Sequence, residues 1–462
     1  MRKKEPSPST QRKQVDTQKL NAYAGTLKRM IDCQTVFTPE GHYQAEFDRF
    51  YQVLADAFPK LHKTATRFTF GSGCFVYVVE GRNADKNIML MSHHDVVEGA
   101  EGWDTPPFDA VLKDGALYGR GTIDTKTPLF AQLQACEELL AEGYDFPGIR
   151  LYIGSSNNEE TCGDGMVEAT KFFRQQGIRF AAVLDEGGAI TTGMIPGVSQ
   201  KSAMVAVHEK SRHLYRCVAS QTAKGHGGLN PSTDNALHRM SAFITEVTKK
   251  KIYKSSFSPE VKATFTTHAP YMSFPLNILF GNWTLFSPLI RKIMAGIPQT
   301  SAMLSTQINF TSVAAGDPDN AQVKAKSAQA TMFLRCVRED DLLHGLEKIR
   351  KIGDKYGVTI EPVLRDYCEP TDHQGQAYQI LRQVLAEDFP DVIAAPFLLT
   401  AGTDARHFTG IADSILRFAP IDLDKAQYAS IHGANEHIYI ENVGQCVCFY
   451  KDFIKKTGGE QQ

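Results

Sequence analysis

Three short apolar runs are each followed by acidic or histidine residues, and this repeat constrains the fold more than any other feature. The runs cover residues 87–92, 149–154 and 181–184, and helical patterns separate them. Short unbroken apolar runs are typical of strands buried on both faces. Strands that alternate with helices form parallel sheets, with active sites at their carboxyl ends. We therefore expect one functional edge, formed by the residues that follow the runs: His93, Asp95, Glu159, Glu160 and Asp185.

The segment after the first run contains a possible metal ligand together with its support. His93 and Asp95 are two residues apart, so the carboxylate can orient the imidazole and leave the other ring nitrogen for a metal. Asp124 lies on the glycine-rich segment 119–126, just before a helix expected from Pro128. Each feature alone also has an ordinary structural explanation, since a His-x-Asp triplet at a strand end is often structural and a Glu-Glu pair often lies in a solvated loop.

Taken together, five residues form a plausible ligand set for divalent metal ions: His93, Asp124, Glu160, Asp185 and His432. Imidazoles and carboxylates without a thiolate suit zinc first, then manganese or cobalt. Three carboxylates and a hydroxide carry four negative charges, which two divalent ions balance. A two-ion site needs a bridging carboxylate. Because Glu159 is adjacent to Glu160, its side chain diverges from the ligand and can act as a general base towards water and then as the acid for the leaving amine.

Composition limits the class of protein and its partners. The 462 residues suffice for two or three domains, and 50 Lys and Arg against 52 Asp and Glu give a net charge of -2. This balance predicts no binding of nucleic acid or of anionic membrane. The most apolar long stretch, 271–296, is interrupted by prolines, asparagines and basic residues, which argues against a membrane span. Nine cysteines without a Cys-x-x-Cys pair fit reduced thiols, so we expect a cytoplasmic protein.

The order of patterns predicts two domains, one inserted into the other. Residues 1–15 have the composition of a disordered tail, without the apolar region of a signal peptide. Residues 16–203 and 365–462 form the two parts of a catalytic domain. Between them, residues 204–364 alternate as a β-α-β-β-α-β set, with Met204 to His208 and Leu214 to Ser220 as paired strands. The aromatic and proline-rich part, 251–300, is either a covering or partner-contacting region or plain core packing.

Several motifs, in this order along the chain, resemble metallopeptidase family 20 of dinuclear zinc hydrolases, and most of all its carboxypeptidase S branch. They are Trp103-Asp-Thr-Pro-Pro-Phe108, Leu117-Tyr-Gly-Arg-Gly121, Leu184-Asp-Glu-Gly-Gly188 and His208-Glu-Lys210. The resemblance implies an α/β zinc-peptidase domain, with a mixed and largely parallel sheet flanked by helices. It also implies an inserted α+β ferredoxin-like lid or dimerisation domain, and possibly a homodimer through that lid.

The resemblance also implies a role for each site residue. His93 and Asp185 would hold one zinc, Glu160 and His432 the other, and Asp124 would bridge them. Asp95 would support His93, and Glu159 would be the base. The remaining expected contacts are an oxyanion donor at His226, a carboxylate-binding Arg335, substrate contacts at Gly402 and Thr403, and a lid contact at Gln322. Thr125, Asn158 and Ser211 depart from the family pattern, and Thr125 adjoins a peptide bond that is normally cis in the family.

These observations favour a zinc-dependent hydrolase that cleaves the amide bond to a C-terminal amino acid in small peptides, of the carboxypeptidase or dipeptidase type. Two alternatives stay open: an N-acyl amino acid amidohydrolase of the aminoacylase type, and a catalytically silent binding protein on the same fold. The aromatic content of 251–300 suggests that this segment forms an apolar acyl or side-chain pocket. Serine hydrolases and nucleotide enzymes are disfavoured, because neither a Gly-x-Ser-x-Gly elbow nor a Gly-x-x-x-x-Gly-Lys loop occurs.

Overall fold

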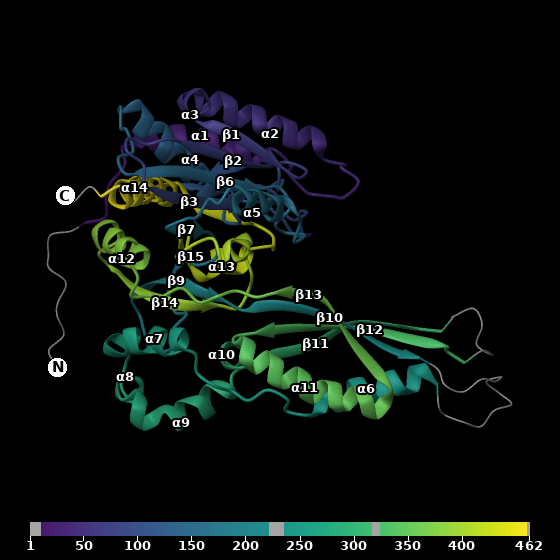
Figure 1. Cartoon of the computed structure of the whole chain (residues 1–462). Helices are drawn as coiled ribbons and strands as arrows, with labels where there is room; N and C mark the ends of the chain where they lie inside the picture. Colours follow the sequence, from purple (N-terminus) through teal and green to yellow (C-terminus); the bar gives the residue numbers. More distant parts are fainter. Residues whose placement is uncertain (1–10, 221–234, 317–323, 460–462) are drawn as a thin grey trace.

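The computed structural model describes residues 11–220, 235–316 and 324–459. The expected site residues His226 and Gln322 lie outside these ranges. A ten-stranded sheet forms the larger part of the molecule and a four-stranded sheet the smaller part (Figure 1). No helix among the described residues is long and apolar enough to cross a membrane. All nine cysteines are unpaired, as their spacing predicts.

The three apolar runs form adjacent strands in the large sheet, in the order β6-β3-β7, and β3 is parallel to both neighbours. The sheet is mixed, because β1 and β2 form an antiparallel hairpin and β9 pairs antiparallel with β8 and β15. Its strands are β1 (Thr66–Phe70), β2 (Cys74–Val79), β3 (Lys86–His93), β6 (Ile149–Ser156), β7 (Ala182–Asp185), β8 (Ile190–Thr191), β9 (Lys201–Glu209), β14 (Val392–Leu399), β15 (Ile415–Arg417) and β16 (Asp422–Leu423).

Helices cover both faces of this sheet, which is why its central strands are apolar throughout. In β3, Ile88 and Leu90 face one hydrophobic cluster, whereas Met89 and Met91 face another. This alternation follows from the two-residue period of a strand. The first cluster is built with α1 (Thr17–Ile31), α2 (Gln44–Ala57), α3 (Pro59–Thr64), α4 (Lys126–Ala141), α12 (Gln376–Asp388) and α14 (Ile440–Thr457), and the second with α5 (Gly165–Gln175) and η2 (Asp404–Phe408).

The smaller sheet confirms the expected β-α-β-β-α-β arrangement. It has the order β11-β12-β10-β13, all antiparallel, and two helices share a hydrophobic cluster with it. We call these elements the lid. They are β10 (Ser211–Ser220), α6 (Ala236–Lys249), β11 (Gln307–Ala315), β12 (Ser327–Cys336), α11 (Glu339–Tyr356) and β13 (Val358–Asp366).

The predicted pairing of residues 204–208 with residues 214–220 is wrong. β9 pairs with β14 in the large sheet, whereas β10 belongs to the lid, so the predicted boundary at residue 204 falls inside a strand of the large sheet. Only Lys210 separates the two strands, and one residue is too short for the two-residue turn of a tight hairpin. The chain therefore passes directly from one sheet into the other.

The last residues of the segment predicted as a disordered tail contact the large domain. Residues 11–15 lie against the large domain, where Arg12 contacts Asp391 and Asp422 at 2.7 Å each and Lys13 contacts Asp388 at 2.9 Å. These acidic partners lie hundreds of residues away in the sequence, so local composition could not indicate them. Residues 1–10 lie outside the described ranges.

Between α6 and β11 the chain forms α7 (Pro259–His268), η1 (Ala269–Tyr271), α8 (Leu276–Gly281), α9 (Trp283–Ala295) and α10 (Pro298–Leu304). Val261 and Phe265 of α7 share a hydrophobic cluster with Met204 of β9 and with Ile393 and Leu398 of β14. α7 therefore covers this end of the large sheet, and α8 and α9 lie beyond it on the side away from the sheet (Figure 1).

His213 in β10 makes stability depend on pH. Its ring is 1% exposed, and neither ring nitrogen has a hydrogen-bond partner among the described residues. Burial, with a smaller effect of Arg365, lowers the pKa of His213 to about 4. The unfolded chain, with a histidine pKa of about 6.5, binds a proton there that the folded chain does not, so stability falls as the pH drops from about 6.5 towards 4.

We expect the His213→Leu variant to lose less unfolding free energy than the wild type when urea unfolding is compared at about pH 7 and about pH 5. A matched His344→Gln variant, on the exposed face of α11, should behave like the wild type. An identical loss in the wild type and in His213→Leu would contradict the burial of a neutral ring.

Candidate metal centre

The ends of three parallel strands bring most of the expected site residues together. His93 is the last residue of β3, Asp185 is the last of β7, and Glu159 and Glu160 follow the end of β6. His93 pairs with Ser156 of β6, and Leu90 pairs with Leu184 of β7, so the three ends lie at one edge. The predicted convergence of these residues at one edge of the sheet is therefore present in the structure.

A small three-stranded sheet joins the other two parts of the site. It consists of β4 (Val111–Lys113), β5 (Ala116–Tyr118) and β17 (His437–Tyr439). Tyr118 of β5 pairs with His437 of β17, and their rings stack with centroids 4.6 Å apart. The loop 119–124 therefore runs beside the loop 431–436, which follows α13 (Lys425–Ser430). Asp124 and His432 are thereby brought together.

Glu436 holds the Asp124 loop in place, a role that we did not predict. Its fully buried carboxylate accepts hydrogen bonds from the backbone N–H groups of Gly121 (3.2 Å), Ile123 (2.7 Å) and Asp124 (3.1 Å), and from Arg120 Nη1 at 2.7 Å. Such backbone donors bind a carboxylate strongly when it is ionised. The only feature of the sequence that could have indicated this role is that Glu436 is an acidic residue four positions after His432, a predicted ligand.

Asp124 lies between the two histidines, as a bridging carboxylate would. One carboxylate oxygen lies 3.0 Å from Nε2 of His93, and the other lies 3.1 Å from Nε2 of His432. The same His432 nitrogen lies 3.2 Å from Oε2 of Glu160. Ligand atoms of His93, Asp124 and Glu160 all lie within 4.8 Å of one another. The peptide bond between Asp124 and Thr125 is cis.

The electrostatics of this cluster fit a bound cation. Hydrogen bonds to Asp124 and Glu160 raise the pKa of His432 to about 10. Burial raises the pKa of Asp124, but its bonds to His432 and His93 outweigh this and hold the pKa well below its usual range. Oε1 of Glu160 is buried and has no hydrogen-bond partner among the described residues. The cluster therefore combines ionised carboxylate with an unsatisfied oxygen, which is what a metal site supplies.

Asp95 connects His93 to the Glu-Glu pair. Nδ1 of His93 donates to the backbone carbonyl of Asp95 at 2.9 Å and lies 3.4 Å from its carboxylate, which leaves Nε2 directed at the cluster. The Asp95 carboxylate accepts the backbone N–H groups of Glu159 (3.1 Å) and Glu160 (3.0 Å). One buried side chain thus orients an imidazole and fixes the backbone of two acidic residues.

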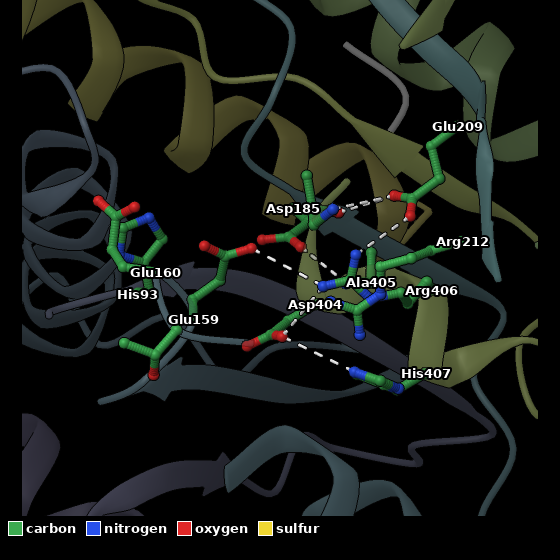
Figure 2. A network of polar contacts seen from close by, with 12 residues as sticks. His93, Glu159, Glu160, Asp185, Glu209, Arg212, Asp404, Ala405, Arg406 and His407 are labelled. Atoms are coloured by element: carbon green, nitrogen blue, oxygen red, sulfur yellow. Dashed lines mark hydrogen bonds and ion pairs between the residues drawn. The ribbon is translucent and has the colours of Figure 1, made fainter. Parts of the chain in front are cut away.

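Glu159 lies between the ligand cluster and a buried arginine. Figure 2 shows the Glu159 carboxylate with His93 and Glu160 on one side and Arg406 on the other. Nη2 of Arg406 lies 3.9 Å from Oε1 of Glu159. Burial raises the pKa of Glu159 well above its usual range, and the opposite effects of His93 and Arg406 are smaller. A carboxylate with a raised pKa is suited to exchange protons near neutral pH.

Backbone groups engage the carboxylate of Asp185, one of the expected ligands. Its two carboxylate oxygens accept the backbone N–H groups of Glu186 and Ala405, each at 2.9 Å, and it does not line the cavity of the site. Glu186 does line that cavity. Burial, followed by the charges of Asp124 and Asp185, raises the pKa of Glu186 well above its usual range. Neighbouring residues at a strand end point in opposite directions, so the adjacent acid faces the cluster instead.

The cavity has a volume of about 600 Å³, and three arginines line it: Arg212, Arg335 and Arg406. A Cβ atom added to Gly402 would lie 3.2 Å from Nη1 of Arg335 and would clash with Arg406, which explains why glycine stands there. Thr403 lines the cavity too, but its N–H and hydroxyl donate to Glu209 at 3.1 and 3.2 Å. The expected substrate-binding residues Arg335, Gly402 and Thr403 thus lie in one wall.

Arg335 and Arg406 differ in how their positive charge is compensated. Arg406 is buried with carboxylate oxygens of Asp366 at 3.3 Å, Glu209 at 3.6 Å, and Glu159 and Asp404 at 3.9 Å. Arg335 forms no ion pair within the described residues; its Nη1 donates to the backbone carbonyl of Lys210 at 3.3 Å. Burial lowers the pKa of Arg335. Its charge therefore remains available for a carboxylate.

Apolar side chains make up another part of the cavity wall. None of them comes from residues 251–300, so the prediction that this aromatic segment forms the pocket is wrong. The segment packs on the far end of the large sheet instead. The apolar residues in the wall are Ile123, Pro128, Leu214, Phe333, Leu399, Ile421, Leu423, Tyr428 and Ile431.

The chain belongs to peptidase family M20/M25/M40, whose model matches residues 89–456. Within the family it lies in the carboxypeptidase S branch. It is therefore a hydrolase of peptide or linear amide bonds, and members of this family depend on metal ions. The motifs and their order along the chain predicted this family.

Individual relatives agree with this assignment. The human N-fatty-acyl-amino acid synthase/hydrolase PM20D1 is 30% identical over 446 residues, which is 94% of this chain and 88% of the relative. The probable carboxypeptidase S-like 2 of Dictyostelium discoideum is 29% identical over 90% of this chain and 80% of its own. The crystal structure of the M20 family metallo-carboxypeptidase Sso-CP2 from Sulfolobus solfataricus superposes with a TM-score of 0.64 at 16% identity, and the match covers 96% of this chain and 99% of that one.

Replacing Glu436 with glutamine should weaken metal binding by about 10- to 100-fold, because residues that orient ligands have effects of this size. The substitution removes the charge that holds the Asp124 loop and leaves buried Arg120 without its carboxylate. Competition with a chromogenic chelator measures the affinity. Glu441→Gln, at an exposed position of α14, is the matched control. Equal affinities in the Glu436 variant and the wild type would contradict this role.

Proposed function

We propose that this protein is a two-zinc hydrolase that cleaves the amide bond to a C-terminal amino acid in small peptides, as a carboxypeptidase or dipeptidase does. The observation that carries the proposal is that one cavity holds the His93–Asp124–His432 cluster, the carboxylate of Glu159 and the guanidinium of Arg335, which forms no ion pair within the described residues. An amide next to a free carboxylate is the substrate that these three parts match. Manganese or cobalt would suit the same ligands.

Divalent ions bound at this cluster supply Lewis acidity, which lowers the pKa of water and polarises an amide carbonyl. Glu159 accepts a proton from the attacking water as the new C–O bond forms, and delivers it to the leaving nitrogen when the C–N bond then breaks. Arg335 binds the free carboxylate through parallel N–H donors and fixes the register of the substrate. His226 as the oxyanion donor and Gln322 as a lid contact remain predictions, since both lie outside the described residues.

The proposed ligands are His93, Asp124, Glu160 and His432, together with Glu186 in place of Asp185. We expect Glu186→Gln to lower the zinc retained per chain after dialysis, whereas Asp185→Asn should retain the wild-type amount, because the Asp185 oxygens are engaged by backbone N–H groups. Elemental analysis of the dialysed proteins measures this. Zinc loss in Asp185→Asn with retention in Glu186→Gln would reinstate Asp185 as the ligand.

A second candidate function is the hydrolysis of N-acyl amino acids. The apolar part of the cavity wall favours it, since Ile421, Leu423 and Ile431 offer a surface for an acyl chain. The relatives named N-fatty-acyl-amino acid synthase/hydrolase support it as well. Arg335 and Glu159 would act as they do on a peptide. The third possibility, a catalytically silent protein, fits poorly with a complete ligand set and Glu159 in place. A homodimer through the lid also remains a proposal.

The test is amino acid release from a panel of dipeptides and N-acyl amino acids by the zinc-loaded protein. We expect Glu159→Gln to lower kcat at least about 100-fold at unchanged zinc content, because it removes the general base. Asp404→Asn, a change of a second acid beside Arg406, should have a much smaller effect. The order of substrates decides between peptidase and acylase. No release from any of them by a protein with two zinc ions bound would favour the silent binding protein.

A further inference from the structure

An exposed apolar surface covers α8, α9 and their flanking residues. The described residues include sixteen exposed large hydrophobic side chains, and seven of these lie between residues 271 and 297. The most exposed are Phe274 at 78% and Leu285 at 73%. The others are scattered singly over the molecule, which is ordinary for a protein surface. We call the seven residues the α9 surface: Tyr271, Phe274, Ile278, Leu285, Leu289, Ile293 and Ile297.

α9 is apolar on two sides. Trp283, Ile290 and Met294 are buried in the hydrophobic cluster that includes α7. Leu285, Leu289 and Ile293 are spaced four residues apart and therefore form one stripe on the outward side. A helix that is apolar on its inner and outer sides needs something besides its own protein to cover the outer one. Figure 1 shows α8 and α9 beyond α7, with no described element on their outer side.

The chain segment that includes the α9 surface is mostly basic, although Lys250 pairs with Glu246 of the lid at 2.6 Å. Residues 249–316 contain seven Lys and Arg and a single acidic residue, Glu260, which is buried 3.6 Å from His208. The segment therefore carries a formal charge of +6, whereas the whole chain carries -2, so the remainder carries -8. The whole-chain balance, which predicted no anionic partner, hid this local excess. The seven basic residues, all exposed, are Lys249, Lys250, Lys251, Lys254, Lys262, Arg291 and Lys292.

This charge decides between the possible occupants of the surface. A second copy docked through a twofold axis would place the same basic segment against itself, which is repulsive. An anionic bilayer offers an apolar interior for the exposed stripe and phosphate groups for the basic side chains. Apolar and basic residues in neighbouring positions are the features of helices that lie in a membrane interface. Each Lys or Arg near an anionic bilayer adds to the attraction.

We propose that the α9 surface docks this enzyme on the surface of anionic phospholipid membranes. Phe274 and Leu285 enter the boundary between headgroups and acyl chains, and Arg291 and Lys292 contact lipid phosphates. The chain lies on the bilayer and does not cross it. Docking does not depend on which amide the enzyme hydrolyses, so it can be tested without a substrate.

The test is sedimentation of the full-length protein with vesicles of phosphatidylcholine alone or mixed with phosphatidylserine. We expect binding to the mixed vesicles that weakens with added salt, and little binding to phosphatidylcholine alone. The double variant Phe274→Ser/Leu285→Ser should bind the mixed vesicles at least tenfold more weakly, a lower bound of about 1.4 kcal/mol. Arg291→Gln/Lys292→Gln should bind more weakly and lose part of the salt dependence. Leu112→Ser/Leu343→Ser, which changes exposed leucines elsewhere, should bind like the wild type.

Thermal unfolding checks that the variants are folded, which is expected because the substituted side chains are exposed. Failure of the wild type to sediment with either vesicle, or wild-type binding by Phe274→Ser/Leu285→Ser, would overturn the proposal. A dimer in analytical ultracentrifugation that this double variant abolishes, without vesicle binding by the wild type, would instead assign the α9 surface to contacts between copies.

Discussion

The concentration of buried carboxylates at one sheet edge is the constraint on which the rest of the structure depends. An ionised carboxylate away from water must be paired or hydrogen-bonded. Backbone N–H groups satisfy Asp95 and Asp185, while buried arginines stabilise two others, Arg120 with Glu436 and Arg417 with Glu209 at 2.6 Å. Glu159, Glu160 and Glu186 face the cavity with weaker compensation: Glu159 lies 3.9 Å from Arg406, and Oε1 of Glu160 has no hydrogen-bond partner among the described residues. The fold thus compensates these supporting acids more closely than the acids that face the cavity.

Features encoded locally were predictable from the sequence. The three buried strands follow from short apolar runs, and the acids that follow them meet because parallel strands end together. The direction of a side chain at a strand end depends on the phase of the pleat. The sequence alone therefore does not show which of the adjacent acids Asp185 and Glu186 faces the cavity. The functions of Glu436 and Arg406 depend on partners far away in the sequence, such as Arg120 and Glu209. The path of β9 was missed because its pairing partner, β14, lies almost two hundred residues later.

The cavity combines groups from the two sheets. The ligand cluster and Glu159 lie at the edge of the large sheet, whereas Arg335 lies on β12 of the lid. Arg406 places a positive charge beside Glu159. Four carboxylates, including that of Glu159, surround the Arg406 guanidinium. Among the described residues, Arg335 forms no ion pair, so Arg335 and Arg406 differ in how far carboxylates of the chain compensate them. The apolar side chains form a separate part of the cavity wall.

The direct passage from β9 into β10 has a mechanical consequence. Lys210, the single residue between the strands, donates from Nζ to the carbonyl groups of Ala302 and Ser305 at 2.8 and 2.9 Å, and its own carbonyl accepts from Arg335. The passage from the large sheet into the lid, the end of α10 and the guanidinium of Arg335 thus meet at one residue. A displacement of the lid at this point would therefore act directly on α10 and on Arg335, because no flexible linker separates β9 from β10.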